Sequence, residues 1–385
     1  MPKKYALQYV EMEKETAYLG AGDGTVLVPQ LQEQIACEPF VNQALEDTSI
    51  ISSVFQSGEA PRKGLQDGSF TLSLDLAALS ANTGGAITID ELGKVLRDAV
   101  GASVCGTGST LNDVTPSTTE YDLTSAAGVA IGDMILVGGE ARFVANKATN
   151  TVTVTPSHSA PPTNGSTAYA GQTLTPSDTR STYKVTIHND LTNGFLVEGV
   201  HMVPSFEGLS AGEGKAKVKL ACSLGKWTDE TSDLDTISPV NVGDIPAVVQ
   251  SEGKFVLTDG TTTINANVSA FSLGNLLTEN RPQDVTKPNC IGAPAIVPAK
   301  PEISVELWET NAERETLRAW FSDRTDLELV YQIGSGNSDC IAFYFPKVFL
   351  KGEPSITDKG GLVSLKTSLQ VSAPAGEAHF VMARF

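Results

Sequence analysis

The sequence predicts a mainly β fold of the α+β class, with two tandem β-sandwich or barrel-forming domains, each with one packed helix, and a small inserted all-β domain. Three observations lead to this prediction. Short segments with alternating apolar and polar residues recur along the chain. Two segments have helical spacing, and one succession of elements occurs twice. The 385 residues suffice for two or three domains, and 41% of them are hydrophobic, which permits packed cores.

The clearer copy of the repeated succession lies within 301–373. It reads as a strand, a helix, a strand and a long two-stranded hairpin. The expected elements are a strand over 302–308, a helix over 311–321, a strand over 326–333, and hairpin arms over 340–351 and 362–372. The helix gathers Leu317, Trp320 and Phe321 on one side, a pattern typical of packing on a sheet.

The other copy begins with strict alternation over 69–76, where Phe70, Leu72 and Leu74 face one way. Asp90 is a suitable helix N-cap, and Gly101 ends the predicted helix. A strand over 183–188 and a hairpin over 195–224 follow. The order and lengths of these elements agree with the clearer copy once 102–180 is removed, which indicates a tandem duplication.

The segment 102–180 differs in composition from both copies. It is rich in Thr, Ser, Gly and Pro and contains several short alternating runs, so it is expected to be a small β module. The predicted domains are an N-terminal arm (1–45), a first domain split into 46–101 and 181–230, the inserted β domain (102–180), a linker (231–250) and a second domain (251–385).

The net charge of −18 comes from 45 acidic and 27 basic residues. A nucleic-acid binder normally shows the reverse balance, because it must displace counterions from phosphates. The acidity fits either simple solubility or a surface that a polyanion passes without being held. No apolar run approaches the roughly 20 residues of a membrane span, and no secretory signal opens the sequence, so a soluble protein without membrane contact is expected.

The search for catalytic motifs gives no active site. The five scattered cysteines and four histidines show no metal-ligand spacing, and there is no nucleophile elbow or phosphate-binding glycine loop. Carboxylates cluster at Glu306, Glu309, Glu313, Glu315 and Glu328. A glycosidase needs only two, but aromatic residues are just 6% of the chain, so exposed carboxylates are favoured over a sugar-cleaving site. We expect no catalytic residue, cofactor or metal.

Several segments together resemble the tail tube (major tail) proteins of long-tailed, non-contractile bacteriophages. The resemblance lies in the strand 302–308, the helix after it, 327–332, the aromatic-x-Pro-Lys-Val run within 341–348, and 362–372. The N-terminal half is similar over 68–76 and the helix that ends at Gly101. The run 130–137 is similar to a small β domain that some of these proteins carry outside the tube.

This resemblance implies a structural virion protein that polymerises into stacked rings around a channel. Two tube domains in one chain imply three copies per ring with pseudo-sixfold symmetry. The chain is then assembled in the host cytoplasm and located in the virion tail. Its expected partners are further copies of itself and the tape measure, tail terminator and distal tail proteins, and genome DNA passes through without specific binding.

The resemblance also suggests particular contact and channel residues. The arm 1–45 and the loops expected over 57–68 and 281–298 are the candidate contacts between subunits or rings, with the residues Tyr5, Tyr9, Arg62, Lys63 and Arg281. The candidate acidic residues facing the channel are Asp75, Glu306 and Glu328.

Two other functions stay open at this point. The first is a host-recognition or carbohydrate-binding tail protein in which 102–180 is the binding module. It predicts that the isolated module binds cell-surface glycan and that it exposes aromatic rings, for which only Tyr121, Phe143 and Tyr169 are available. The second is a glycan hydrolase, which requires a cleft with paired carboxylates.

Overall fold

The computed structural model confirms a mainly β fold. It describes residues 9–27, 41–46, 49–50, 57–58, 62–79, 89–177, 180–188, 194–210, 214–230, 254–282, 284, 286, 292–293, 295–308, 311–359, 362–373 and 378–385. Strands dominate these residues, and the two helices described among them are both short.

Repeat 1, as we call the N-terminal sheet system, contains one of these helices. Its elements are β1 (Tyr9–Glu15), β2 (Gly22–Leu27), β3 (Val41–Glu46), β4 (Ser49–Ile50), β5 (Ser57–Gly58), β6 (Arg62–Asp75), α1 (Glu91–Val100), β15 (Tyr183–His188), β16 (Gly194–Glu207), β17 (Lys217–Ser223) and β18 (Lys226–Glu230).

Repeat 2 contains the other helix. Its elements are β19 (Lys254–Thr258), β20 (Thr263–Ala266), β21 (Val268–Leu273), β22 (Leu277–Asn280), β23 (Ala295–Pro298), β24 (Glu302–Trp308), α2 (Asn311–Asp323), β25 (Leu327–Ile333), β26 (Ile341–Leu350), β27 (Ser355–Lys359), β28 (Leu362–Ser372) and β29 (Val381–Arg384).

The two repeats share their strand order over six strands. In repeat 1 the order is β2-β1-β15-β16-β17-β6, and in repeat 2 it is β20-β19-β25-β26-β28-β24, with antiparallel neighbours throughout. The next strands differ: β3 pairs with the start of β6, ahead of the part that pairs with β17, whereas β21 pairs with β24 directly opposite β28. The final strands correspond as well, because β18 pairs with the start of β16 and β29 pairs with the start of β26. The duplication therefore also includes β1 and β2 of repeat 1 and β19 and β20 of repeat 2, which were not part of the duplication predicted from the sequence.

A long bent strand divides each repeat into two sheets. The first half of β16 pairs with β18 and the second half with β17, and β26 divides its partners between β29 and β28 in the same way. Both strands carry a bulge at the change of partner. Gly199 adopts a positive φ of 66° at one bulge, and Pro346, which has no N–H to offer a ladder, lies at the other.

The chain between α1 and β15 forms a separate six-stranded sheet, which we call the inserted module. Its strands are β8 (Ser109–Thr110), β9 (Glu120–Asp122), β10 (Met134–Val137), β11 (Glu140–Ala148), β12 (Thr151–Thr155) and β13 (Thr167–Ala170). Two strands flank it, β7 (Gly101–Cys105) and β14 (Gln172–Pro176). They extend the sheet of repeat 2 beyond β29, in the order β29-β14-β7.

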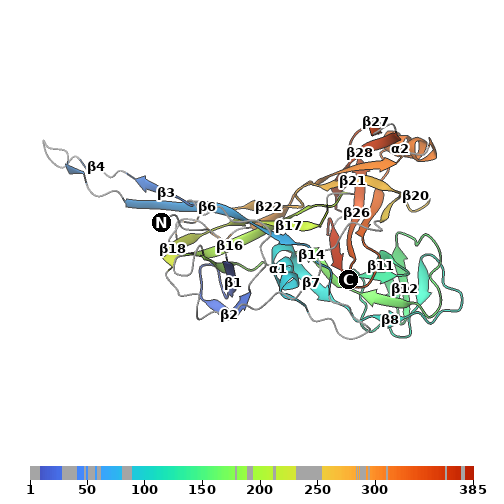
Figure 1. Ribbon diagram of the computed structural model, residues 1–385, viewed down its shortest axis with the longest axis horizontal. Coiled ribbons are helices and arrows are strands. Elements are labelled where there is room, and N and C mark those ends of the chain that lie inside the picture. The colour runs from blue at the N-terminus through green and yellow to red at the C-terminus, as the bar shows by residue number, and fades with distance from the viewer. Residues whose placement is uncertain are drawn as a thin grey trace.

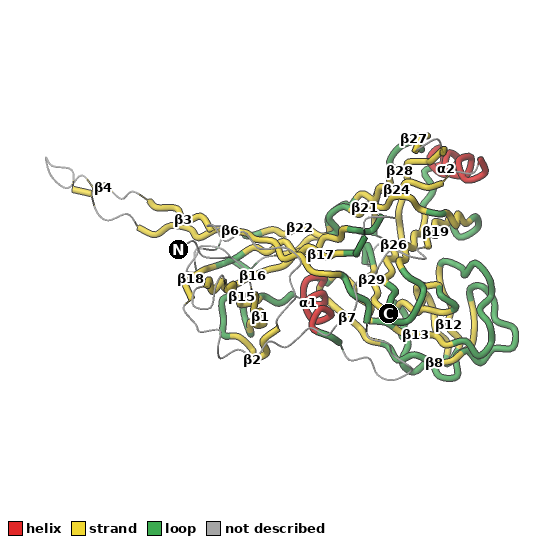
Figure 2. The backbone as a smooth tube through the Cα atoms, in the orientation of Figure 1, coloured by secondary structure: helices red, strands yellow, loops and turns green. Residues whose placement is uncertain are grey.

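Figure 1 shows an elongated molecule. The β3–β6 hairpin projects at one end, and α2 lies with β27 and β28 at the other. The inserted module lies beside β26 and the C-terminus, while Figure 2 shows α1 near the middle. One apolar cluster of buried residues continues through both repeats, so they share a core.

Local sequence explains the two ends of α1. The Asp90 side chain accepts a hydrogen bond from the Gly93 N–H at 2.6 Å, as an N-cap should. Gly101 ends the helix with a φ of 131°, and a Cβ there would lie 2.5 Å from the backbone nitrogen of Ser177. The predicted helix therefore has the boundaries that its capping residues indicate.

The N-terminal arm predicted over 1–45 is wrong for its described residues. Tyr9–Glu15 forms β1, which pairs with β15 and places Val10 and Met12 in the core at 1% and 0% exposure. Residues 41–46 form β3 against β6. Val10 and Met12 alternate with charged neighbours as a half-buried strand requires, but the run is short.

Four other predicted boundaries also need correction. The inserted domain was drawn too wide at 102–180, because both of its edges form strands of the repeat 2 sheet. The loop expected over 57–68 is largely strand, since β6 starts at Arg62, and 281–298 ends in β23. The hairpin arms 340–351 and 362–372 pair directly only over Lys347–Leu350, and β27 forms the closer hairpin with β28. The linker 231–250 lies outside the described residues.

Candidate assembly interface

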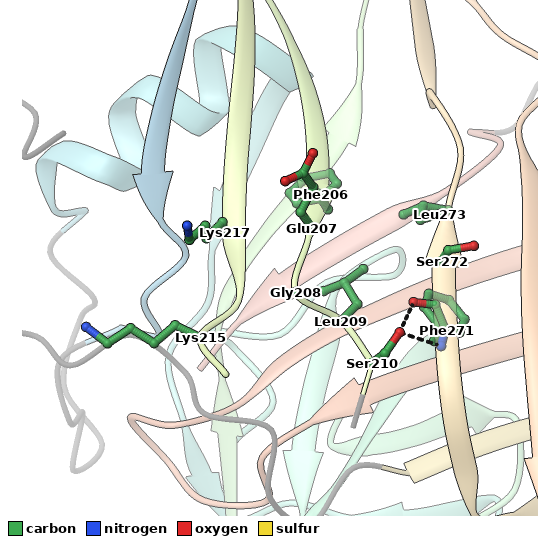
Figure 3. A pocket seen from close by; sticks show the side chains of 10 residues that line it. All are labelled: Phe206, Glu207, Gly208, Leu209, Ser210, Lys215, Lys217, Phe271, Ser272 and Leu273. Atoms are coloured by element: carbon green, nitrogen blue, oxygen red, sulfur yellow. Dashed lines mark hydrogen bonds between the residues drawn. The ribbon is translucent and has the colours of Figure 1, made fainter. Parts of the chain in front are cut away.

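The two repeats meet along a seam at β21, where a serine side chain, instead of a neighbouring strand, hydrogen-bonds to the backbone of one edge. β21 pairs with β24 on one side, and on the other side the Ser210 hydroxyl bonds to both the N–H and the carbonyl of Phe271, each at 3.0 Å (Figure 3). The Tyr331 hydroxyl donates to the Leu209 carbonyl beside it. Because unpaired backbone groups are costly when buried, these bonds fix repeat 2 against the end of β16.

A second polar contact joins the β22–β23 hairpin to repeat 1. The Ser223 hydroxyl lies 2.5 and 2.6 Å from the two carboxylate oxygens of Glu279. Arg281 pairs with the same carboxylate at 3.1 Å and donates to the Leu224 carbonyl. The repeat 2 hairpin is thus held on the end of β17.

The C-terminal strand is attached to the start of α1 by one buried cation. Arg384 has no exposed surface, and its guanidinium donates to both carboxylate oxygens of Asp90, at 2.9 and 2.7 Å. It also donates to the Ala77 and Ala78 carbonyls at 2.7 and 3.2 Å, and to the Gln172 side chain at 3.0 Å. One side chain therefore connects repeat 2 to three segments that precede it.

A groove of about 460 Å³ lies along this seam. Its lining residues, shown in Figure 3, are Phe206, Glu207, Gly208, Leu209, Ser210, Lys215, Lys217, Phe271, Ser272 and Leu273. Glu207 is the one carboxylate among them, whereas hydrolysis of a glycoside requires two.

The inserted module is fixed to repeat 2 by both apolar and polar contacts. Phe143 stacks on Tyr344 with ring centroids 4.4 Å apart. The Gln332 side chain accepts from the Ala141 N–H at 2.7 Å and donates to the Gly139 carbonyl at 3.0 Å. An apolar cluster lies between the two bodies, with Met134, Leu136, Ala141, Val256, Val330, Cys340, Ala342, Tyr344, Val381, Ala383 and Phe385. The module is not a freely hinged appendage.

A buried charge cluster lies at the same junction. Arg142 has no exposed surface and donates to Glu140 at 2.6 Å, while Lys254 of β19 reaches the same carboxylate at 3.2 Å. Nδ1 of His158 lies 3.3 Å from Glu140, and the Ser159 hydroxyl donates to it. Glu140 therefore joins the module to repeat 2.

The carboxylates of these two clusters have lowered pKa values. Burial raises the pKa of Glu140, but the hydrogen bond with His158, the Arg142 charge and the Ser159 bonds outweigh it, so the pKa lies well below its usual 4.5. Burial likewise opposes ionisation of Asp90, but the bonds and charge of Arg384 lower its pKa from 3.8. Both groups are ionised at neutral pH.

We expect the stability to fall as the pH decreases from about 6.5 to 4. Burial, with the charges of Arg180 and Arg281, lowers the pKa of His201 to about 4 from 6.5. In that window the unfolded histidine binds a proton that the folded one does not, so acid favours unfolding. Urea titrations at several pH values test this, and His201→Leu should flatten the slope. An unchanged slope in the variant contradicts this role of His201.

The predicted contact residues lie in different parts of the structure. Tyr5 lies outside the described residues, and Tyr9 starts β1 opposite His188. Arg62 and Lys63 belong to β6 and pair in register with β3 near the tip of the projecting hairpin. Arg281 does lie at an interface, but it is the seam between the repeats of one chain.

The predicted channel residues also separate. Asp75 and Glu306 lie on corresponding strands, β6 and β24. Asp75 contacts a lysine, and Glu306 contacts a serine hydroxyl. Asp75 pairs with Lys215 at 3.4 Å, and Glu306 accepts from the Ser364 hydroxyl at 2.7 Å. Glu328 instead accepts from Thr155 of the inserted module, so it lies on a face that the module covers.

Apart from Arg281, the residues that build the seam were absent from the predicted set. Ser210, Glu279 and Arg384 have no distinctive sequence context, because serine, glutamate and arginine are common surface residues. The only signal for Arg384 is its place in an apolar C-terminal run, Phe380 to Phe385, where a lone cation is unusual.

Comparison with known proteins does not identify the chain, since neither a family model nor a curated protein matches it. Among the described residues, no group of three or more histidine, cysteine or acidic side chains is placed to hold a metal ion. Neither helix in that part of the chain has the length and apolar character to cross a membrane.

Proposed function

We propose that this chain is the subunit of a tail tube, a stack of rings around a channel through which a phage genome passes. The observation that carries the proposal is the duplicated strand order of the two repeats and the way in which they meet. The resemblance to tail tube proteins of long-tailed phages leads to the same function.

The seam between the repeats is heterologous. The surface that repeat 1 supplies is the end of β16 and β17, whereas repeat 2 supplies β21 and β22. When two similar units bind through two different surfaces, each unit keeps one surface that can bind a further unit. Repeating such a contact generates a closed ring or an open filament. In the described part of the chain, the surfaces that remain for a neighbour are the β3–β6 hairpin of repeat 1 and the ends of β26 and β28 in repeat 2.

The simplest closed assembly in which every such surface is paired is a ring of three chains. It contains six repeats with pseudo-sixfold symmetry, and its sheet edges are covered by neighbours rather than left to aggregate. The net charge of −18 suits a wall that DNA must pass without adhesion. Tape measure, tail terminator and distal tail proteins are the partners that such a tube needs inside and at its ends.

The glycan-binding alternative has no such support. Tyr121 is fully buried, Phe143 stacks on Tyr344, and Tyr169 packs against the apolar junction between the module and repeat 2. None of these three rings is presented as an open platform for a sugar.

Electron microscopy of the purified protein at rising concentration tests the proposal. We expect tubes with an axial hole whose averaged rings show six density lobes from three chains, with three inserted modules per ring. Protein that stays monomeric at all concentrations, or solid filaments without a hole, would overturn the proposal, and rings of six chains would overturn the arrangement of three chains per ring.

A further inference from the structure

We infer that the β3–β6 hairpin of one chain packs on the ends of β26 and β28 of a second copy, around Gln370. This inference rests on the proposed function and names the contact that closes its ring. It comes from the internal symmetry of the chain, because repeat 2 already uses its corresponding hairpin in this way on repeat 1.

The strand registers define which residues correspond. Both repeats have a bulge opposite the strand that follows the helix, so Val200, which pairs with Tyr183, corresponds to Val348, which pairs with Leu327. Two residues further along, Met202 pairs with Cys222, and Leu350 pairs with Leu369. Ser223, one residue after Cys222, therefore corresponds to Gln370.

The pairing of β17 with β6 and of β28 with β24 extends this correspondence to the β3–β6 and β22–β23 hairpins. Cys222 pairs with Phe70, and Leu369 pairs with Ile303, so these two partners correspond. Lys63 precedes Phe70 by seven positions (70 − 63), and Ile296 precedes Ile303 by seven (303 − 296). Lys63 pairs with Leu45 just beyond a bulge in β6, and Ile296 pairs with Glu279, so the backbone position of Leu45 corresponds to that of Glu279 to within about one residue.

The established contact between Ser223 and Glu279 therefore has one counterpart, between Gln370 and position 45. Within one chain these positions belong to opposite ends of the molecule. The β3–β6 hairpin projects from the end of repeat 1 in Figure 1, and in the described residues β6 lies beside β17 and β18 of that same repeat. The counterpart contact can therefore form only with a second copy.

The receiving surface has the composition of its counterpart. Gln370 and Ser372 are half-exposed at the end of β28, as Ser223 is at the end of β17. Both places offer short or amide side chains with hydrogen-bonding groups and no net charge of their own. The Gln370 amide nitrogen donates to the Pro301 carbonyl at 3.0 Å, and its amide oxygen can accept a hydrogen bond from the backbone of a strand hairpin. Leu45 has no side-chain hydrogen-bonding group, so this contact uses backbone groups where the seam uses the Glu279 carboxylate.

A paired-cysteine experiment tests this contact in the full chain. Leu45→Cys with Gln370→Cys is treated with a short thiol-to-thiol crosslinker after assembly and run on a denaturing gel. We expect covalent dimers and trimers, because each chain carries both halves of the contact. The bands should be at least ten times stronger than in the wild type, whose five cysteines set the background.

Three matched variants make the outcome decisive. Ser223→Cys with Glu279→Cys should crosslink within one chain, without dimers, and so reports that the seam is folded. Leu45→Cys alone and Leu45→Cys with Ser223→Cys, the corresponding position in the wrong repeat, should stay at background. Thermal unfolding of each variant reports its integrity.

The results separate this inference from the proposed function. Tubes that form normally, with a working intrachain crosslink but no dimers from the Leu45 and Gln370 pair, overturn the inference and leave the tube standing. A wild-type chain that never forms tubes overturns the proposed function itself. Dimers at equal yield from the Leu45 and Ser223 pair also overturn the inference, because the contact then lacks the predicted register.

Discussion

Replacing Glu140 with glutamine should lower the free energy of unfolding by about 3–5 kcal/mol, the usual cost of removing one partner from a buried ion pair. The substitution keeps the side-chain volume but leaves the Arg142 guanidinium, which has no exposed surface, without its anion. It also removes the charge that Lys254 contacts from repeat 2. Urea unfolding followed by tryptophan fluorescence measures the loss.

A second substitution shows whether the unpaired charge is the cause. Glu140→Gln combined with Arg142→Met should recover part of the lost stability, because it removes the buried cation as well. Asp326→Asn is the matched control, since Asp326 pairs with Lys347 at 2.6 Å but its side chain is 63% exposed. Equal effects of Glu140→Gln and Asp326→Asn would show that burial of the cluster contributes nothing.

Replacing Arg384 with methionine should cost a similar amount, about 3–5 kcal/mol. The change leaves the Asp90 carboxylate without its main partner, and it leaves the Ala77 and Ala78 carbonyls without their donor. Because these groups belong to different segments, hydrogen exchange should accelerate together in α1, in β14 and in β29.

An exposed arginine provides the comparison for Arg384. Arg318 pairs with Glu353 at 3.3 Å, but both side chains are more than half exposed, so Arg318→Met should leave the unfolding midpoint almost unchanged. If Arg384→Met unfolds at the same midpoint as Arg318→Met, or if exchange accelerates in β29 alone, the connection of repeat 2 to α1 through this residue is refuted.

Local patterns predicted the elements that satisfy local rules. Alternation identified β24 and β15 with their observed boundaries, and capping residues identified α1. β1 was missed because its two buried apolar residues, Val10 and Met12, alternate with Glu11 and Glu13, so the run looks like a polar arm. The tandem duplication was visible in the order of elements, while its full extent required the strand order.

Local sequence patterns could not predict the seam between the repeats, and the reason is physical. The bonds that build it join residues far apart in the chain: 294 positions for Arg384 and Asp90, 61 for Ser210 and Phe271, and 56 for Ser223 and Glu279. A single sequence carries no record of which distant groups meet after folding. Arg281 was selected for its loop, and it lies at an interface of a different kind from the one expected.

Covalent linkage of the two repeats has a consequence for how a ring can grow. A contact between tethered domains forms at an effective concentration on the order of millimolar, whereas a contact between free chains depends on the amount of protein present. Half of the contacts in the proposed ring therefore form during folding, and only the other half respond to expression level. The seam and its counterpart are also free to evolve different affinities. A permanent intrachain contact beside a weaker, reversible one lets misplaced chains leave before a ring closes.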